Sequence, residues 1–203
     1  VVILGDQLSP DIAALNATRP ANAIVLMAEV AAETRYAWHH KKKLAFVLSA
    51  MRHFAVQLRS QGWQVDYVEL EDDGNTGTFT GEIDRALKRH GVGHVVVTHP
   101  GEWRVLASLK EWSQRQPVTL EVLEDTRFAC STPAFAGWAK GRKQLRMEYF
   151  YRHMREQTGL LMNDAGPEGA RWNFDHDNRK PADAALDLPD VPRFTPDSMT
   201  EVV

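Results

Sequence analysis

The chain has 203 residues, of which 43% are hydrophobic and 25% charged, so it can build a core and is not a disordered protein. Its net charge of -3 excludes a globally basic surface, so any contact with nucleic acid needs a local patch. The single cysteine, Cys130, excludes an intramolecular disulfide and an iron–sulfur site built from this chain's cysteines. We find no signal peptide and no apolar run long enough to cross a bilayer, which predicts a reducing, cytoplasmic setting.

The first strand is predicted at the very start of the chain. Residues 1–4 are apolar and mostly β-branched, which is typical of a strand buried on both faces, and Gly5, Asp6 and Gln7 break the run. Residues 9–11 predict a helix start, with serine as the N-cap and proline at the first helical position. Because ligands of open α/β sheets bind beyond the carboxyl ends of the strands, this turn is the first candidate for a site.

Further strands and helices are predicted to alternate along the chain. Strands are expected over residues 23–27, 64–70, 94–98 and 118–123, with helices over 39–60, 79–89 and 104–116. This alternation predicts a parallel sheet with right-handed crossovers and helices on both faces. We therefore expect a Rossmann-like three-layer α/β/α fold, whose five-stranded parallel sheet has the order 3-2-1-4-5 and the first strand at its centre.

The alternation ends near residue 125. Residues 135–139 and 147–161 are predicted helical pieces, and glycine, proline and charged residues dominate from residue 163 onwards. We expect an α/β domain over residues 1–130, a helical extension over 131–162 and an interdomain linker over 163–203. The linker composition, and a start directly on a strand, predict a fragment of a longer protein with a second domain.

Residues 33–43 contain an unusual group of polar side chains. They follow the second predicted strand and are expected at the same edge of the sheet as residues 5–7. Asp6 and Glu33 can accept hydrogen bonds from a hydroxylated heterocycle, and Tyr36 can form a wall of its site. A solvated helix N-terminus explains the same residues equally well. His39 and His40 point about a hundred degrees apart on a helix and cannot easily share one ion, so no metal site is expected.

Other motifs are less specific. The sequence has no GxGxxG, P-loop or GxSxG pattern, which disfavours dinucleotide dehydrogenases, P-loop NTPases and α/β-hydrolases. Residues 100–104 are more typical of a structural helix start than of an anion site. Residues 141–152 mix cations with aromatic residues, which fits either a nucleic-acid contact or an amphipathic helix that packs Met147, Phe150 and Met154. We expect the packed helix for the apolar and aromatic residues and leave the role of the cations open. The bulky residues within 171–179 are expected to dock on another surface.

Taken together, these stretches resemble the photolyase/cryptochrome superfamily, and within it the bacterial iron–sulfur branch of (6-4) photolyases, the deoxyribodipyrimidine photolyase-related proteins. The resemblance rests on LGDQLSP at 4–10, HHKKK at 39–43, SAMRHFA at 49–55, FTGE at 79–82, PGEWRV at 100–105, GRK at 141–143, MEYFYR at 147–152, TGLLMN at 158–163, RWNFD at 171–175 and NR at 178–179.

The resemblance implies an N-terminal antenna domain with most of the interdomain linker. The antenna of this branch is 6,7-dimethyl-8-ribityllumazine, whereas FAD, the lesion pocket and a [4Fe-4S] cluster belong to a helical C-terminal domain outside this chain. By resemblance the lumazine site consists of Gly5, Asp6, Gln7, Ala28, Glu33, Tyr36, His39, Lys43 and Val47.

By resemblance the chain is the antenna-binding part of a light-dependent DNA repair flavoprotein. It is expected to hold no catalytic residues, while the parent protein acts as a DNA photolyase, a carbon-carbon lyase. The expected partners are its own C-terminal FAD domain and, through the parent, UV-damaged DNA, with no membrane. Two alternatives stay open, a cryptochrome-like photoreceptor fragment and a stand-alone Rossmann-like nucleotide-binding module.

Overall fold

The computed structural model describes residues 1–176, 179, 181–183 and 185–203. Asp177, Asn178, Lys180 and Ala184 lie outside the described residues, and with them parts of the predicted linker and of the 171–179 cluster. The chain divides into two compact units. Unit 1 comprises residues 1–127 and 195–203, and unit 2 comprises residues 128–194.

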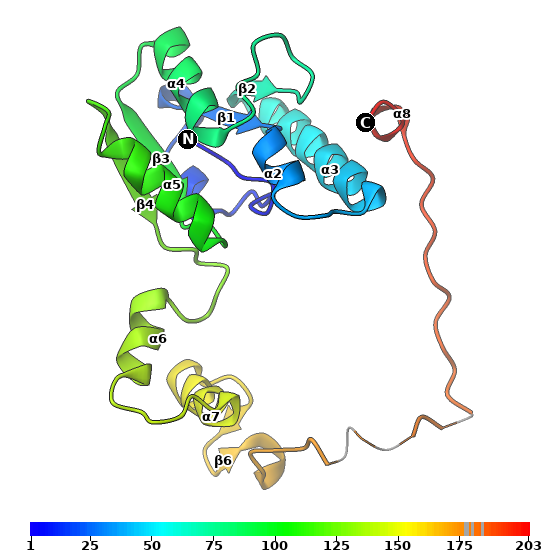
Figure 1. The fold of residues 1–203 in the computed structure, drawn as a ribbon. Helices are drawn as coiled ribbons and strands as arrows, with labels where there is room; N and C mark the ends of the chain where they lie inside the picture. The colour runs from blue at the N-terminus through cyan, green and yellow to red at the C-terminus, as the bar shows by residue number, and fades with distance from the viewer. Residues whose placement is uncertain (177–178, 180, 184) are drawn as a thin grey trace. The chain divides into compact units, whose positions relative to one another are not determined.

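The strands of unit 1 form two parallel pairs (Figure 1). Strand β1 (Ile24–Ala28) pairs with β2 (Gln64–Val68), and β3 (His94–Thr98) pairs with β4 (Thr119–Leu123). The predicted α/β class and the parallel pairing within each pair are confirmed.

Residues 1–4 lie between the two strand pairs. Val2 makes isolated parallel bridges to Leu26 of β1 and to Val97 of β3, and its backbone N–H donates to Val96 O over 2.9 Å. A continuous five-stranded sheet is not shown, because the first segment forms bridges and not a strand of its own. Pairing stops early since the chain turns directly after Leu4, whose carbonyl accepts from the Gln7 backbone N–H.

Unit 1 also contains short and long helices. They are α1 (Ala13–Asn16), η1 (Pro20–Asn22), α2 (Ala31–Arg35), α3 (Lys41–Ser60), α4 (Phe79–His90), α5 (Trp103–Ser113) and α8 (Ser198–Glu201). The Thr78 side chain caps the start of α4, and Gly91 ends that helix in the left-handed conformation, with φ 64°. No helix in the described part of the chain is both long and apolar enough to span a membrane.

The prediction for the first helix was wrong at its start. Ser9 and Pro10 lie in a turn before α1, which begins only at Ala13 with Ile12 at the N-cap position. The Ser9 hydroxyl accepts from the Asp11 backbone N–H over 3.4 Å, so it stabilises this turn and not a helix start. The serine and proline therefore form a turn here and do not begin the helix.

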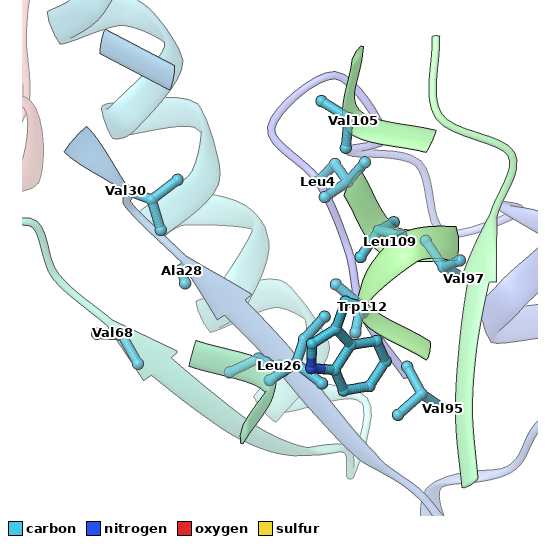
Figure 2. Packing of buried hydrophobic residues seen from close by; sticks show 12 residues of the cluster. Leu4, Leu26, Ala28, Val30, Val68, Val95, Val97, Val105, Leu109 and Trp112 are labelled. Atoms are coloured by element: carbon cyan, nitrogen blue, oxygen red, sulfur yellow. The ribbon is translucent and has the colours of Figure 1, made fainter. Parts of the chain in front are cut away.

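Alternate residues of the strands bury their side chains on opposite faces. On one face, Leu26 and Val97 belong to a cluster with Leu109 and Trp112 of α5, which Figure 2 shows from close by. On the other face, Val25 and Met27 belong to a cluster with residues of α1 and α3. Helices therefore cover both faces of the strands, and α3 and α5 project their N-terminal ends near the carboxyl ends of β1 and β3 (Figure 1).

Unit 2 is built around a small aromatic cluster. Its elements are α6 (Thr132–Ala139), α7 (Met147–Thr158), the antiparallel pair β5 (Met162–Asn163) and β6 (Gly166–Pro167), and η2 (Glu168–Ala170). Phe150 of α7 packs edge-on against Phe135 and Trp138 of α6, with ring centroids 5.1 and 4.9 Å apart. The expectation that Met147 packs in the same way was wrong, because Met147 is 75% exposed at the first turn of α7.

The C-terminal helix α8 is tied to α3 through a histidine–carboxylate pair. His53 Nε2 lies 2.6 Å from Asp197 Oδ2, and the same carboxylate caps α8 by accepting from the Thr200 N–H. The hydrogen bond to Asp197 raises the pKa of His53, and the bond to His53 lowers the pKa of Asp197 to about 2. The stability that protonated His53 adds to this pair is fully present below the ordinary histidine pKa of about 6.5. It is lost as the pH rises through the raised pKa of His53. The stability that the ionised Asp197 adds is fully present above its ordinary pKa of 3.8 and is lost as the pH falls towards 2.

We therefore expect α8 to be held most firmly between about pH 4 and 6.5. An NMR titration should give His53 a pKa above that of an ordinary histidine, and the Thr200 amide should titrate with it. The substitution Asp197→Asn should return the His53 pKa towards its ordinary value. An unchanged His53 pKa in that variant would contradict the pairing.

Candidate functional site

A cavity of about 280 Å³ lies in unit 1 beyond the carboxyl ends of residues 1–4, β1 and β3. Its apolar lining includes Leu4, Val47, Met51 and Val105, which come from the first segment, α3 and α5. Its polar lining comes from the turn after Leu4, from α2 and the residues after it, and from the residues that precede α5. A pocket with apolar walls and a few convergent polar groups is the usual form of a small-molecule site.

Most of the residues predicted for the site line this cavity together. They are Gly5, Asp6, Ala28, Glu33, Tyr36, His39, Lys43 and Val47. Gly5 lies where the backbone approaches α3 closely, since an added Cβ would come 3.2 Å from Met51 Sδ and 3.3 Å from Val47 Cγ1. A side chain at this position would therefore enter the cavity wall.

Gln7 is the predicted site residue that does not line the cavity. It is completely buried, and its side-chain amide donates to the backbone carbonyl of Thr98 over 2.9 Å. Its side-chain oxygen lies 3.4 Å from the Leu4 backbone N–H. Gln7 thus joins the first turn to the end of β3 and supports the cavity floor from behind.

Four charged and aromatic side chains form a closed group at the cavity rim, which we call the Arg104 cluster: Glu33, Tyr36, Glu102 and Arg104. Arg104 donates through both terminal nitrogens to the Glu33 carboxylate, over 2.9 and 2.8 Å, and Nη2 also donates to Glu102 over 2.9 Å. Its guanidinium lies 4.3 Å from the centre of the Tyr36 ring. The Tyr36 hydroxyl closes the group by donating to Glu102 over 3.0 Å.

The hydrogen bonds of the Arg104 cluster raise the pKa of both Arg104 and Tyr36. The hydrogen bonds to Glu33 raise the pKa of Arg104, and the hydrogen bond to Glu102 raises the pKa of Tyr36. The arginine therefore stays charged and the phenol stays neutral across the physiological range. A ligand at this rim meets two carboxylates, Glu33 and Glu102, whose charge the single guanidinium of Arg104 balances only in part.

Asp6 provides a further acceptor at the turn after Leu4. Desolvation by the surrounding protein is the main cause that raises the pKa of its carboxyl, and Arg127 opposes the effect. Gly101 allows the close approach, since a Cβ there would lie 2.9 Å from Asp6 Oδ2. A carboxyl that keeps its proton to higher pH can donate as well as accept a hydrogen bond.

The two adjacent histidines have separate partners. His40 caps α3, with Nδ1 accepting from the Lys42 backbone N–H over 3.1 Å, whereas His39 Nδ1 lies 3.3 Å from Lys43 Nζ. His39 also packs edge-on against the Tyr36 ring, with centroids 5.1 Å apart. Among the described residues, no group of three or more histidine, cysteine or acidic side chains is placed to hold a metal ion.

A buried carboxylate network supports the cavity from the end of β1. The Glu29 side chain is fully buried and accepts from Arg52 Nε over 2.7 Å and Nη2 over 3.1 Å. Tyr67 and the Leu70 backbone N–H also donate to it, over 2.7 and 2.9 Å. The hydrogen bond to Glu29 raises the pKa of Arg52, while burial is the main cause that raises the pKa of Tyr67. The network therefore fixes the chain at the end of β1, where Ala28, Glu29 and Val30 line the cavity.

Sequence reasoning missed several residues of the site. Glu29, Met51, Pro100, Gly101 and Glu102 line the cavity, and Arg104 holds its rim. The signal for the residues at 100–104 was present, because they follow a buried strand whose carboxyl end meets that of the first segment. They were interpreted as a structural helix start because a sequence does not show that Glu33 lies opposite Arg104.

In unit 2, arginines of α7 and of the segment before it lie over aromatic rings. The Arg142 guanidinium lies 4.3 Å from the Trp138 ring centre and donates to the Trp138 carbonyl over 2.7 Å. Arg152 and Arg155 both lie over the Trp172 ring, at 5.7 and 5.4 Å. The bulky residue Trp172 therefore docks on α7, within the same unit.

Comparison with known proteins gives the family. Residues 1–203 match the family described as deoxyribodipyrimidine photo-lyase-related protein. The chain is also 48% identical, over all of its 203 residues, to a (6-4) photolyase of Agrobacterium fabrum (strain C58 / ATCC 33970). The match spans 40% of the length of that relative. The chain belongs to the family of deoxyribodipyrimidine photo-lyase-related proteins.

Proposed function

We propose that this chain is the antenna-binding region of a light-dependent DNA repair flavoprotein of the (6-4) photolyase kind, and that it binds 6,7-dimethyl-8-ribityllumazine. The observation that carries the proposal is the cavity at the carboxyl ends of the strands, which combines apolar walls with carboxylate acceptors. Its volume of about 280 Å³ lies just below the range of about 300–1,000 Å³ that is usual for small-molecule pockets.

The residues present fit a flat heterocycle that carries a hydroxylated chain. Val47 and Met51 offer apolar contact to the ring system, and Tyr36 offers an aromatic wall. Asp6 and Glu33 offer acceptors for the hydroxyls of a ribityl chain. Gly5, Ala28, His39 and Lys43 complete the proposed contacts, and Gln7 acts from behind the floor.

An antenna transfers excitation and does no bond chemistry. The task of this chain is then to bind the chromophore, to orient it and to exclude water from it. No catalytic residue is needed for these tasks, which agrees with a site composed of apolar walls and carboxylates held by ion pairs. The lumazine itself supplies the light absorption.

We also propose that residues 1–4 serve as the central strand of a Rossmann-like sheet. The order would be β2, β1, residues 1–4, β3 and β4, which is the expected order 3-2-1-4-5. The support is that Val2 bridges to both β1 and β3 and that Ile3 donates to Leu26 O over 3.0 Å.

For the whole protein, we propose a DNA photolyase that carries FAD and a [4Fe-4S] cluster in a helical C-terminal domain and repairs UV-damaged DNA in the cytoplasm. The support is the 48% identity to a (6-4) photolyase of which this chain matches 40%. Cys130 is the only cysteine of the chain, so the four thiolates of such a cluster have to come from elsewhere.

Adding 6,7-dimethyl-8-ribityllumazine to the chain should change the absorption spectrum of the pigment and raise the melting temperature. At a free concentration of 100 times Kd, binding adds about 2.7 kcal/mol to the free energy of unfolding. ATP and FMN should give a smaller shift at the same concentration. No spectral change and no shift with lumazine would overturn the proposal, and stabilisation by ATP instead would favour a nucleotide-binding module.

A further inference from the structure

The Arg104 cluster connects two elements that are far apart in the sequence. Glu33 lies in α2 and Tyr36 directly after it, whereas Glu102 and Arg104 lie at the start of α5. Glu33, Tyr36 and Glu102 line the cavity, while Arg104 is not part of its lining. Arg104 therefore contacts three wall residues from the outer side.

Apart from the Arg104 cluster, a further contact to a side chain of this wall is the edge-on packing of His39 on the Tyr36 ring. Helix α2 has five residues and none of them is buried, and Tyr36 is 48% exposed. The Ala32 backbone N–H donates to Gly77 O over 2.9 Å, but this bond fixes the backbone and not the wall side chains. The planar guanidinium, by contrast, fixes the Glu33 carboxylate at two points and the Tyr36 ring through its face.

We propose that Arg104 is the positioning residue of the chromophore site: by holding Glu33, Tyr36 and Glu102 in one arrangement, it sets the orientation of the bound ring system. The inference rests on the proposed antenna function, for which orientation is what the protein must supply. The fork geometry matters because a lysine ammonium can contact the same carboxylates but cannot reproduce the planar two-point contact with Glu33 while it stacks on the Tyr36 ring.

The test compares Arg104→Met and Arg104→Lys with a control, Arg115→Met, in the 203-residue chain. Arg115 follows the end of α5 and pairs with Glu111 over 3.5 Å, and both side chains are about 70% exposed. Each protein is titrated with 6,7-dimethyl-8-ribityllumazine, and the fluorescence anisotropy decay of the bound pigment measures its local rotation. Thermal unfolding of each variant without ligand monitors the fold.

The pigment should be immobile in the parent chain and in Arg115→Met. In Arg104→Met it should gain a fast local rotation, and its dissociation rate should rise about tenfold. Arg104→Lys should keep most of the affinity yet show the fast rotation. Pigment that is equally immobile in the parent chain and in both Arg104 variants would overturn the inference and leave the antenna function standing. A parent chain that binds no lumazine would overturn both.

Discussion

Replacing Glu29 by alanine is expected to lower the free energy of unfolding by about 3–5 kcal/mol, because the change leaves a largely buried arginine without its main partner. The Glu29 side chain is fully buried and the Arg52 side chain is only 16% exposed. The substitution also removes the acceptor of the Tyr67 hydroxyl and of the Leu70 N–H. Urea denaturation followed by circular dichroism measures the effect.

Glu69 provides a matched control on the same arginine. Its carboxylate lies 3.2 Å from Arg52 Nη2, but its side chain is 52% exposed. Because exposed ion pairs contribute little, Glu69→Ala should cost about 0–1 kcal/mol. Equal losses of unfolding free energy in the two variants would show that burial does not determine how much the Glu29 network adds to stability.

The regular elements could be predicted from the sequence because their signals are local. The apolar spacing in residues 39–60 predicted α3, which spans Lys41–Ser60, and the apolar run at 94–98 predicted β3 with the same bounds. Helix α2 was missed because five residues without a buried face carry no periodic pattern. The start of α1 was misplaced because a serine–proline pair favours a turn as well as a helix start.

The candidate site was predictable in its position but not in its pairings. Polar residues after a buried strand identify the rim, which is how Asp6 and Glu33 were found. The partner of Glu33 is Arg104, 71 residues further along the chain. Gln7 was predicted for the site because it lies in the turn after residues 1–4, yet its side chain faces the backbone at the end of β3 and does not line the cavity. Such choices depend on tertiary contacts that no local pattern encodes.

A large side chain at Gly5 should strongly weaken chromophore binding without unfolding the chain. In Gly5→Leu, the new Cβ would come 3.2 Å from Met51 Sδ and 3.3 Å from Val47 Cγ1, and the rest of the side chain would occupy space that the ligand needs. The methionine side chain is flexible and can give way, so the fold should persist. We expect the affinity for 6,7-dimethyl-8-ribityllumazine to fall at least about 100-fold, measured by titrating the absorption of the pigment.

Gly5→Ala and Gly93→Leu complete the series. The alanine variant adds only the Cβ and should weaken binding less than leucine does. Gly93 precedes β3 and has no atom within 4 Å of an added Cβ, so a leucine there should leave binding unchanged. If Gly5→Leu keeps the parent affinity while its melting temperature stays the same, the chromophore cannot occupy the cavity next to Gly5. The binding site would then have to be sought on another surface of the chain, since steric exclusion at Gly5 is the most direct consequence of the proposed location.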